Sequence, residues 1–229
     1  MNRRDKSPIV SLLFLVAIVW MSQPVFAAPL PALSGWQGRT IPILGTALDY
    51  QSNQIGVVAH LVLGFRERND HYGLNVRFRT KPGRFSPAAQ VAVQNAIIHI
   101  ARAAGLNEKS WSVQLMIPYN GITMYGESLS AMVGLAVVAL AQGDTFPQDR
   151  VVTGKVLSDG HLGSVGGVPQ KIEAAYAEHF QRVIVPEEHD TEDGDWRTPF
   201  LMHISPVANV TQAYQALTGQ PLRHLKSSG

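Results

Sequence analysis

The chain has 229 residues, of which 45% are hydrophobic and 16% charged, so it can bury a core of its own and is not a disordered protein. Its formal net charge of +2 comes wholly from the first 27 residues, and the remainder carries 16 basic and 16 acidic side chains. A chain without a basic surplus has little electrostatic attraction for nucleic acid or anionic lipid, and we expect neither as a partner.

The first 27 residues have the three-part pattern of an export signal. Three basic side chains precede an apolar run at residues 9–21, and Val25-Phe26-Ala27 provides a small-residue cleavage site. The run has 13 residues, fewer than the roughly 20 that span a bilayer. We therefore expect cleavage after Ala27 and export to the periplasm or the medium. The alternative is an uncleaved membrane anchor formed by residues 9–21.

The next part of the chain predicts an extended segment followed by strands. Residues 28–50 are rich in Pro, Gly and Ala and are interpreted as an extended segment that leads into one domain at residues 51–229. Residues 55–65 and 74–79 have the composition of two strands joined by a polar turn. We find no internal repeat, no low-complexity segment and no linker that would divide this domain.

Helix and strand signals alternate through the middle of the chain. Ser86-Pro87 predicts the beginning of a helix, with the serine as N-cap, and Gly105 predicts its end. Apolar and polar residues then alternate over residues 111–117, which predicts a half-buried strand followed by a loop at 119–127. Residues 128–142 are apolar on nearly every side, so this segment is predicted to be a buried helix.

The last third continues the alternation. Residues 151–157 and 162–165 flank Asp159-Gly160, a dipeptide typical of a β-hairpin turn. Further elements are predicted as a helix over 169–178, strands over 183–185 and 201–204, and a helix over 207–218. The sequence therefore predicts a single α/β domain with mixed sheets and packed helices.

The content of cysteine and histidine limits the chemistry. The chain has no cysteine, which excludes thiol catalysis, cysteine-based zinc sites and iron–sulfur clusters. Its eight histidines are scattered, and none lies in a metal-binding spacing such as H-E-x-x-H. We expect no metal and no cofactor.

Two residues are candidates for catalysis. Ser128 lies at the predicted beginning of a buried helix, where free N–H groups and the helix dipole can stabilise an oxyanion. Lys171 lies in the first turn of a later helix, and burial there would lower its pKa and make it available as a base. Each residue also has a structural interpretation: Ser128 as a simple N-cap, and Lys171 as a solvated surface side chain.

Taken together, the two residues lie in a motif series that resembles the proteolytic domain of the Lon protease family over roughly residues 85–190. In that family a Gly-x pair precedes the catalytic serine, and a Thr-Gly strand, a Gly-containing hairpin and Gly-Gly-x-x-x-Lys follow in order. The corresponding pieces here are Gly126-Glu127-Ser128, Thr153-Gly154, Asp159-Gly160 and Gly166-Gly167-Val168-Pro169-Gln170-Lys171. The order and spacing agree without a gap from Ser128 to Lys171.

The resemblance implies a Ser–Lys dyad. Lys171 in its neutral form would take the proton of the Ser128 hydroxyl, and Ser128 would attack the scissile carbonyl to form an acyl-enzyme. Backbone N–H groups around Gly126, Glu127 and Ser128 would hold the oxyanion, and the Thr153 hydroxyl would orient the lysine amine.

The chain also departs from the family pattern. Leu129 and Ser130 stand where the family usually has Ala and Gly, and their bulk is expected to narrow the cleft. Tyr125 and Lys155 stand where the family usually has acidic residues, so Lys155 either lowers the Lys171 pKa by repulsion or faces solvent. Ser130 is the alternative nucleophile.

The resemblance and the export signal together indicate the kind of enzyme. Lon proteases carry an ATPase module with a G-x-x-x-x-G-K-[ST] loop, and this chain has no such sequence. We therefore expect an exported, ATP-independent serine endopeptidase that acts on peptides or unfolded segments and binds no nucleotide. Lon proteolytic domains assemble as rings, so a homo-oligomer is an open expectation. The alternatives are a catalytically inactive domain with this fold that binds or scaffolds, and an unrelated exported α/β binding protein.

Overall fold

The computed structural model describes residues 35–194 and 197–224, and the predicted export signal lies outside these ranges. In chain order the elements are β1 (Gln37–Leu48), β2 (Gln54–Glu67), β3 (Asn75–Phe78), β4 (Arg84–Phe85), α1 (Pro87–Ala103), β5 (Trp111–Met116), β6 (Thr123–Met124), α2 (Ser130–Gln142), β7 (Arg150–Val152), β8 (Lys155–Val156), β9 (Leu162–Gly163), α3 (Val168–Ala177), β10 (Arg182–Pro186), β11 (His203–Val207) and α4 (Val210–Thr218). The single-domain α/β prediction is confirmed.

The segment at residues 28–50 contributes more structure than the sequence predicts. Its described part forms β1, which pairs antiparallel with β2 over their full lengths as a long hairpin. Proline is unusual inside a sheet, but Pro42 is accommodated because β1 is an edge strand. Proline is tolerated at an edge because its missing N–H leaves no partner unpaired. The chain therefore turns at residue 50 within one sheet, and no domain boundary lies there.

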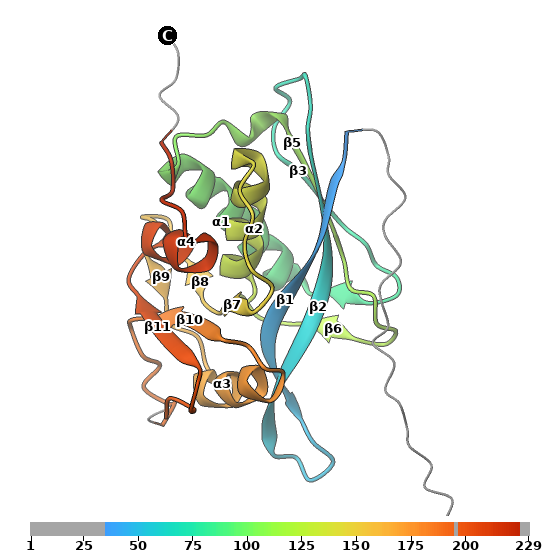
Figure 1. The fold of residues 1–229 in the computed structure, drawn as a ribbon. Coiled ribbons are helices and arrows are strands. Elements are labelled where there is room, and N and C mark those ends of the chain that lie inside the picture. The colour runs from blue at the N-terminus through green and yellow to red at the C-terminus, as the bar shows by residue number, and fades with distance from the viewer. Residues whose placement is uncertain (1–34, 195–196, 225–229) are drawn as a thin grey trace, which may run out of the picture.

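The main sheet has the strand order β1-β2-β5-β3 (Figure 1). The sequence predicts β2, β3 and β5, with bounds that agree within a few residues. It does not predict that β5 lies between the other two, antiparallel to β2 and parallel to β3. Helix α1 follows β3 and returns the chain to the sheet, and this connection allows the parallel pairing.

Two helices cover one face of the main sheet (Figure 1). Ser86 caps α1 by accepting a hydrogen bond from the Ala89 N–H at 3.2 Å, as predicted. Helix α2 is buried on nearly every side, which confirms the prediction, and it crosses α1 at Gly134. A Cβ there would lie 2.7 Å from the Ile100 Cδ1 atom, so only glycine allows this close approach. These side chains, together with those of α4, form what we call the main core.

A second sheet of parallel strands, in the order β7-β10-β11, lies beside the first. Alternate residues of β10 face opposite sides. Ile184 belongs to the main core, whereas Val183 and Val185 pack with Ile172 of α3 in a separate cluster that we call the second core. Leu44 of the long hairpin also joins the second core, so α3 lies between the second sheet and the hairpin (Figure 1).

Several boundaries differ from the prediction. The predicted strand at 151–157 breaks at Thr153-Gly154 into β7 and β8, and β8 pairs with β9 across the predicted hairpin turn. The strand predicted at 201–204 is β11, two to three residues later, because its register is set by pairing with β10. No helix within the described ranges has the length and apolar content needed to span a bilayer.

Candidate active site

The turn before α2 presents Ser128. Gly126 has a left-handed φ of +80°, and the Ser130 N–H donates to the Glu127 carbonyl at 2.9 Å to close the turn. Helix α2 begins at Ser130, and its N-cap residue is Leu129, which makes no side-chain capping bond. The interpretation of Ser128 as the N-cap is therefore wrong, and its half-buried hydroxyl has no hydrogen-bond partner among the described residues.

The stretch Thr153-Gly154 lies against this turn. The Gly154 N–H donates to the Ser128 carbonyl at 3.1 Å, and the Ala131 N–H donates to the Gly154 carbonyl at 3.3 Å. The Thr153 N–H donates in turn to the Ile184 carbonyl at 3.0 Å. The structure thus brings the turn, the break between β7 and β8, and β10 together at one place.

Lys171 is buried in the first turn of α3. Only 3% of the residue is exposed, so the interpretation as a solvated surface lysine is wrong. Desolvation lowers its pKa from 10.5 to about 8, and the negative charge of Asp193 opposes this change. An amine with this pKa has a substantial neutral fraction near neutral pH, which a general base requires.

The turn that precedes Lys171 is held by the lysine side chain and by a distant loop. The Lys171 Nζ atom donates to the Gly166 carbonyl at 2.7 Å. The carboxylate of Asp193 accepts from the Gly167 N–H at 2.8 Å and from the Val168 N–H at 2.9 Å, so it caps α3 from a distant loop. Neither Asp193 nor the Gly166 carbonyl is predicted as a partner of this turn by the sequence. Asp193 belongs to an acidic stretch at 187–193, and nothing in its spacing distinguishes it from the other carboxylates.

Strand β2 fixes the position of this first turn from the other side. A Cβ at Gly56 would lie 1.8 Å from the Gln170 carbonyl oxygen, so the backbone of β2 contacts the backbone of α3 directly. Gln170 precedes Lys171, and any side chain at position 56 would displace the turn that carries the amine.

Hydroxyl groups near the turn lack partners. The side-chain oxygens of Ser130 and Thr153 are buried and accept or donate no hydrogen bond within the described ranges. The Lys171 amine bonds only to Gly166, and no hydrogen bond joins it to the Ser128 hydroxyl. The amine therefore has N–H donors that no described residue uses, and the Ser128 and Thr153 hydroxyls have unused hydrogen-bonding capacity.

The residues that depart from the family pattern have clear positions. Leu129 and Ser130 are 3% and 1% exposed, so both side chains point into the protein, and Ser130 is not accessible to a substrate in this structure. Lys155 lies in the β8–β9 hairpin, where its aliphatic carbons contact Gly163. Tyr125 is exposed. The lowered pKa of Lys171 comes from burial, not from repulsion by Lys155.

Comparison with known proteins places this arrangement in a family. Residues 86–215, more than half of the chain, match the Lon protease (S16) C-terminal proteolytic domain. The chain belongs to this Lon protease family. The matched range begins at the N-cap of α1, includes both Ser128 and Lys171, and ends within α4, whereas β1 and β2 precede it.

Several Lon proteases resemble part of the chain. An archaeal Lon protease from Archaeoglobus fulgidus is 31% identical over 109 residues, which are 47% of this chain and 17% of that protein. The one from Halobacterium salinarum is 29% identical over 145 residues, or 61% of this chain and 20% of that protein. A peroxisomal Lon protease homolog 2 from Caenorhabditis briggsae is 31% identical over 80 residues, which are 35% of this chain and 10% of that protein. The chain thus spans a fifth or less of these Lon proteases.

Proposed function

We propose that this member of the Lon family is an ATP-independent serine endopeptidase that cleaves peptides or unfolded protein segments. Ser128 is the nucleophile and Lys171 the general base in this proposal. The observation that carries it is the burial of Lys171 in the first turn of α3, with a pKa lowered to about 8. Burial of a charged lysine in that environment costs free energy of desolvation, and the neutral amine avoids this cost.

The proposed reaction has two steps. Neutral Lys171 removes the Ser128 proton as the serine oxygen attacks the scissile carbonyl, and the resulting ammonium returns a proton to the leaving amine. Lys171 then activates a water molecule that hydrolyses the acyl-enzyme. In this proposal the amine turns from the Gly166 carbonyl toward Ser128 when a substrate excludes water from the site, and the Thr153 hydroxyl orients it.

The proposed oxyanion site is the backbone of the same turn. The N–H groups of Ser128 and Leu129 have no hydrogen-bond partner among the described residues. Free N–H groups beside a nucleophile can stabilise the negative charge that develops on the carbonyl oxygen. Gly126 and Glu127 shape the turn that presents these groups.

Turnover of a fluorogenic peptide library tests the dyad. The wild-type chain is expected to cleave, whereas Ser128→Ala and Lys171→Met each lose at least about 100-fold in kcat/KM. Ser130→Ala is the matched control, because Ser130 is two residues away and buried, and it is expected to remain within about threefold of wild type. Equal rates for wild type and Lys171→Met would remove Lys171 from the mechanism.

A second function is favoured by one observation. The Lys171 amine is bonded to Gly166 and not to Ser128, as expected for a binding or scaffold domain that keeps the fold without the activity. A serine-directed fluorophosphonate probe distinguishes the two functions. Labelling that Ser128→Ala abolishes supports the peptidase, and an unlabelled wild-type chain that binds peptides without cleaving them supports the scaffold.

We also propose that the domain acts outside the cytoplasm, because residues 1–27 have the pattern of a cleavable export signal. Amino-terminal sequencing of the protein recovered from the periplasm or medium is expected to begin at Ala28. Recovery of the intact chain in the membrane fraction would favour the anchor instead.

A further inference from the structure

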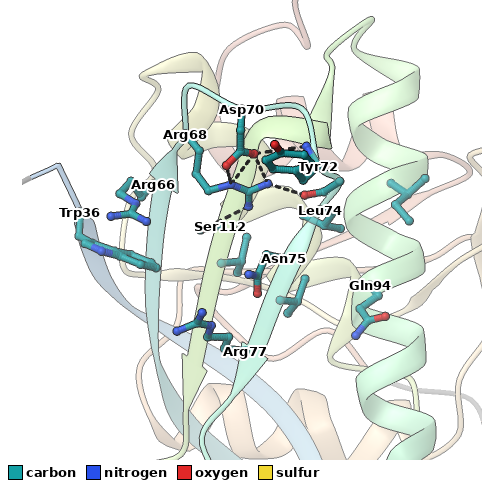
Figure 2. A pocket seen from close by; sticks show the side chains of 14 residues that line it. Trp36, Arg66, Arg68, Asp70, Tyr72, Leu74, Asn75, Arg77, Gln94 and Ser112 are labelled. Atoms are coloured by element: carbon teal, nitrogen blue, oxygen red, sulfur yellow. Dashed lines mark hydrogen bonds and ion pairs between the residues drawn. The ribbon is translucent and has the colours of Figure 1, made fainter.

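A pocket of about 590 Å³ opens at the β3 edge of the main sheet (Figure 2). Its lining comes from Trp36 just before β1, from β2, β3, β5 and the loop between β2 and β3, and from Gln94 and Ile98 of α1. The register places Arg66, Ser112 and Asn75 side by side on three neighbouring strands, so these side chains share one face. No lining residue belongs to the segments that carry Ser128 or Lys171.

Arg68 builds the wall of this pocket. Its Nε atom donates to the two Asp70 carboxylate oxygens at 2.9 and 3.1 Å (Figure 2). Its Nη atoms donate to the Gly73 and Trp111 carbonyls at 2.6 and 2.7 Å. These bonds tie the loop between β2 and β3 to the beginning of β5. Asp70 forms its ion pair with Arg68, so its negative charge does not neutralise Arg66 or Arg77.

Two further arginines line the pocket without a carboxylate partner. The Arg66 guanidinium stacks on the Trp36 ring at 5.1 Å from its centre, and its Nε atom is buried with no hydrogen-bond partner. Arg77 of β3 is exposed and forms no ion pair with any described residue. The Trp36 ring is itself held over Gly64, where a Cβ would approach it to 3.2 Å.

This arrangement fits a carboxylate. A guanidinium that stacks on an aromatic ring by its face keeps its in-plane Nη atoms available to bind both oxygens of a carboxylate group. The lining holds three arginines and one aspartate, whereas basic and acidic residues balance over residues 28–229. The positive charge is therefore local, and it is accompanied by the amide side chains of Asn75 and Gln94, which can bond a peptide backbone.

The position of β3 indicates the form of the ligand. It is the edge strand of the main sheet, and an edge strand can pair with an added extended segment. Asn75 and Arg77 lie two residues apart, so they point to the same face. Acidic residues two apart in an extended segment also point to one face, so a segment paired with β3 can present them on the face that carries Arg77 and, two strands away on β2, Arg66.

We propose that this pocket binds an acidic, extended segment of a protein partner along β3, with its carboxylates at Arg66 and Arg77. The surface is a second binding site, separate from the Ser128 turn, and it does not depend on catalysis. Its contacts are charge-assisted hydrogen bonds at the two guanidiniums, so its affinity falls as the salt concentration rises.

Fluorescence anisotropy tests the proposal with the full chain carrying Ser128→Ala, which prevents cleavage. The probe is a labelled ten-residue peptide of alternating Glu and Thr, and its counterpart replaces each Glu by Lys. We expect the Glu peptide to bind at low salt and the Lys peptide not to bind. Arg66→Gln/Arg77→Gln is expected to weaken binding of the Glu peptide at least tenfold. Arg77→Gln alone is the second variant, because Arg77 is exposed and its removal leaves folding intact.

The matched control is Arg102→Gln/Arg197→Gln, which removes the same charge from two exposed arginines outside the pocket. It is expected to bind within twofold of the parent. If both double variants lost the same affinity for the Glu peptide, net charge alone would explain the loss, and the proposal would be overturned. Equal affinity for the Glu and Lys peptides would also overturn it. Displacement of the Glu peptide by millimolar inorganic phosphate would overturn the proposal as well. The same holds if the chain binds phosphatidylglycerol vesicles more tightly than the Glu peptide and this binding requires Arg66.

Discussion

At the scale of single residues, the candidate site depends on how Lys171 is kept buried and close to neutral. Its amine has one hydrogen bond, to the Gly166 carbonyl, and the turn containing Gly166 is held by the Asp193 carboxylate. Asp193 acts in two ways: it fixes the backbone of the turn, and its charge raises the pKa of Lys171 against the lowering by burial. It is a positioning residue for the proposed base.

A pH profile separates these two roles. The base acts only when neutral, so kcat/KM is expected to rise with pH through about 8. Asp193→Asn keeps an acceptor for the N–H groups of the turn but removes the charge that raises the Lys171 pKa. The acidic limb is therefore expected to move to lower pH. Asp49→Asn is the matched control, because Asp49 also accepts two backbone N–H groups, at the far turn between β1 and β2.

The control variant should leave the acidic limb where it is in the wild type. If the acidic limb of the Asp193→Asn profile also stays at the wild-type pH, the charge of Asp193 does not affect the pKa of Lys171. Measurement of kcat/KM over pH 6–10 with one fluorogenic peptide is sufficient for all three chains.

The sequence predicted some of these residues and missed others for a physical reason. Ser128, Thr153 and Lys171 lie in local motifs whose order resembles a known family, so each could be singled out before the structure. Asp193 contacts its partners across 25 or more residues, and its neighbours in sequence are equally acidic. Only the fold selects one carboxylate from that run.

At the scale of elements, the contact between β2 and α3 sets the position of Lys171, the proposed base. Gly56→Ala would place a methyl group 1.8 Å from the Gln170 carbonyl oxygen, and both backbones would have to shift. We expect a loss of about 1–3 kcal/mol in the free energy of unfolding. Displacement of the turn by about 1 Å would reduce kcat/KM by about 100-fold. Chemical denaturation and peptide turnover measure the two effects.

The neighbouring strand provides the control for this change. A Cβ at Gly45 of β1 would lie 3.5 Å from a Val57 methyl carbon, an ordinary van der Waals contact. Gly45→Ala is therefore expected to keep both stability, within about 0.5 kcal/mol, and activity. A Gly56→Ala chain as active and stable as Gly45→Ala would contradict the role given to this contact.

Element prediction succeeded where the signal was local. The N-cap at Ser86 and the apolar run of α2 define helices by themselves, and both helices are found within two residues of their predicted ends. Strand β1 was missed because its edge position, which makes Pro42 acceptable, is not visible in the sequence. The order β1-β2-β5-β3 depends on pairings between distant segments, which local patterns do not encode.

At the scale of the whole molecule, the chain corresponds to the proteolytic part of Lon proteases and contains no G-x-x-x-x-G-K-[ST] sequence. Peptide hydrolysis by this chain is expected to be the same, within experimental error, with and without millimolar Mg-ATP. Unfolded casein is expected to be cleaved at least tenfold faster than a stably folded substrate of similar length. The reason is that the sequence has no ATPase motif of this kind to drive the unfolding of a substrate. Stimulation by ATP would contradict the prediction, and the hydrolysis-resistant analogue serves as control.

The site lies where the main core and the second core meet. Ser128 is connected to α2, which belongs to the main core, while Lys171 is carried by α3, whose apolar side chains belong to the second core. The second core is the smaller of the two, so α3 has less apolar packing to hold it. Low concentrations of urea are therefore expected to loosen α3 and move Lys171 away from Ser128 while most of the secondary structure remains. Peptidase activity is then expected to be lost at lower urea concentrations than the circular dichroism signal.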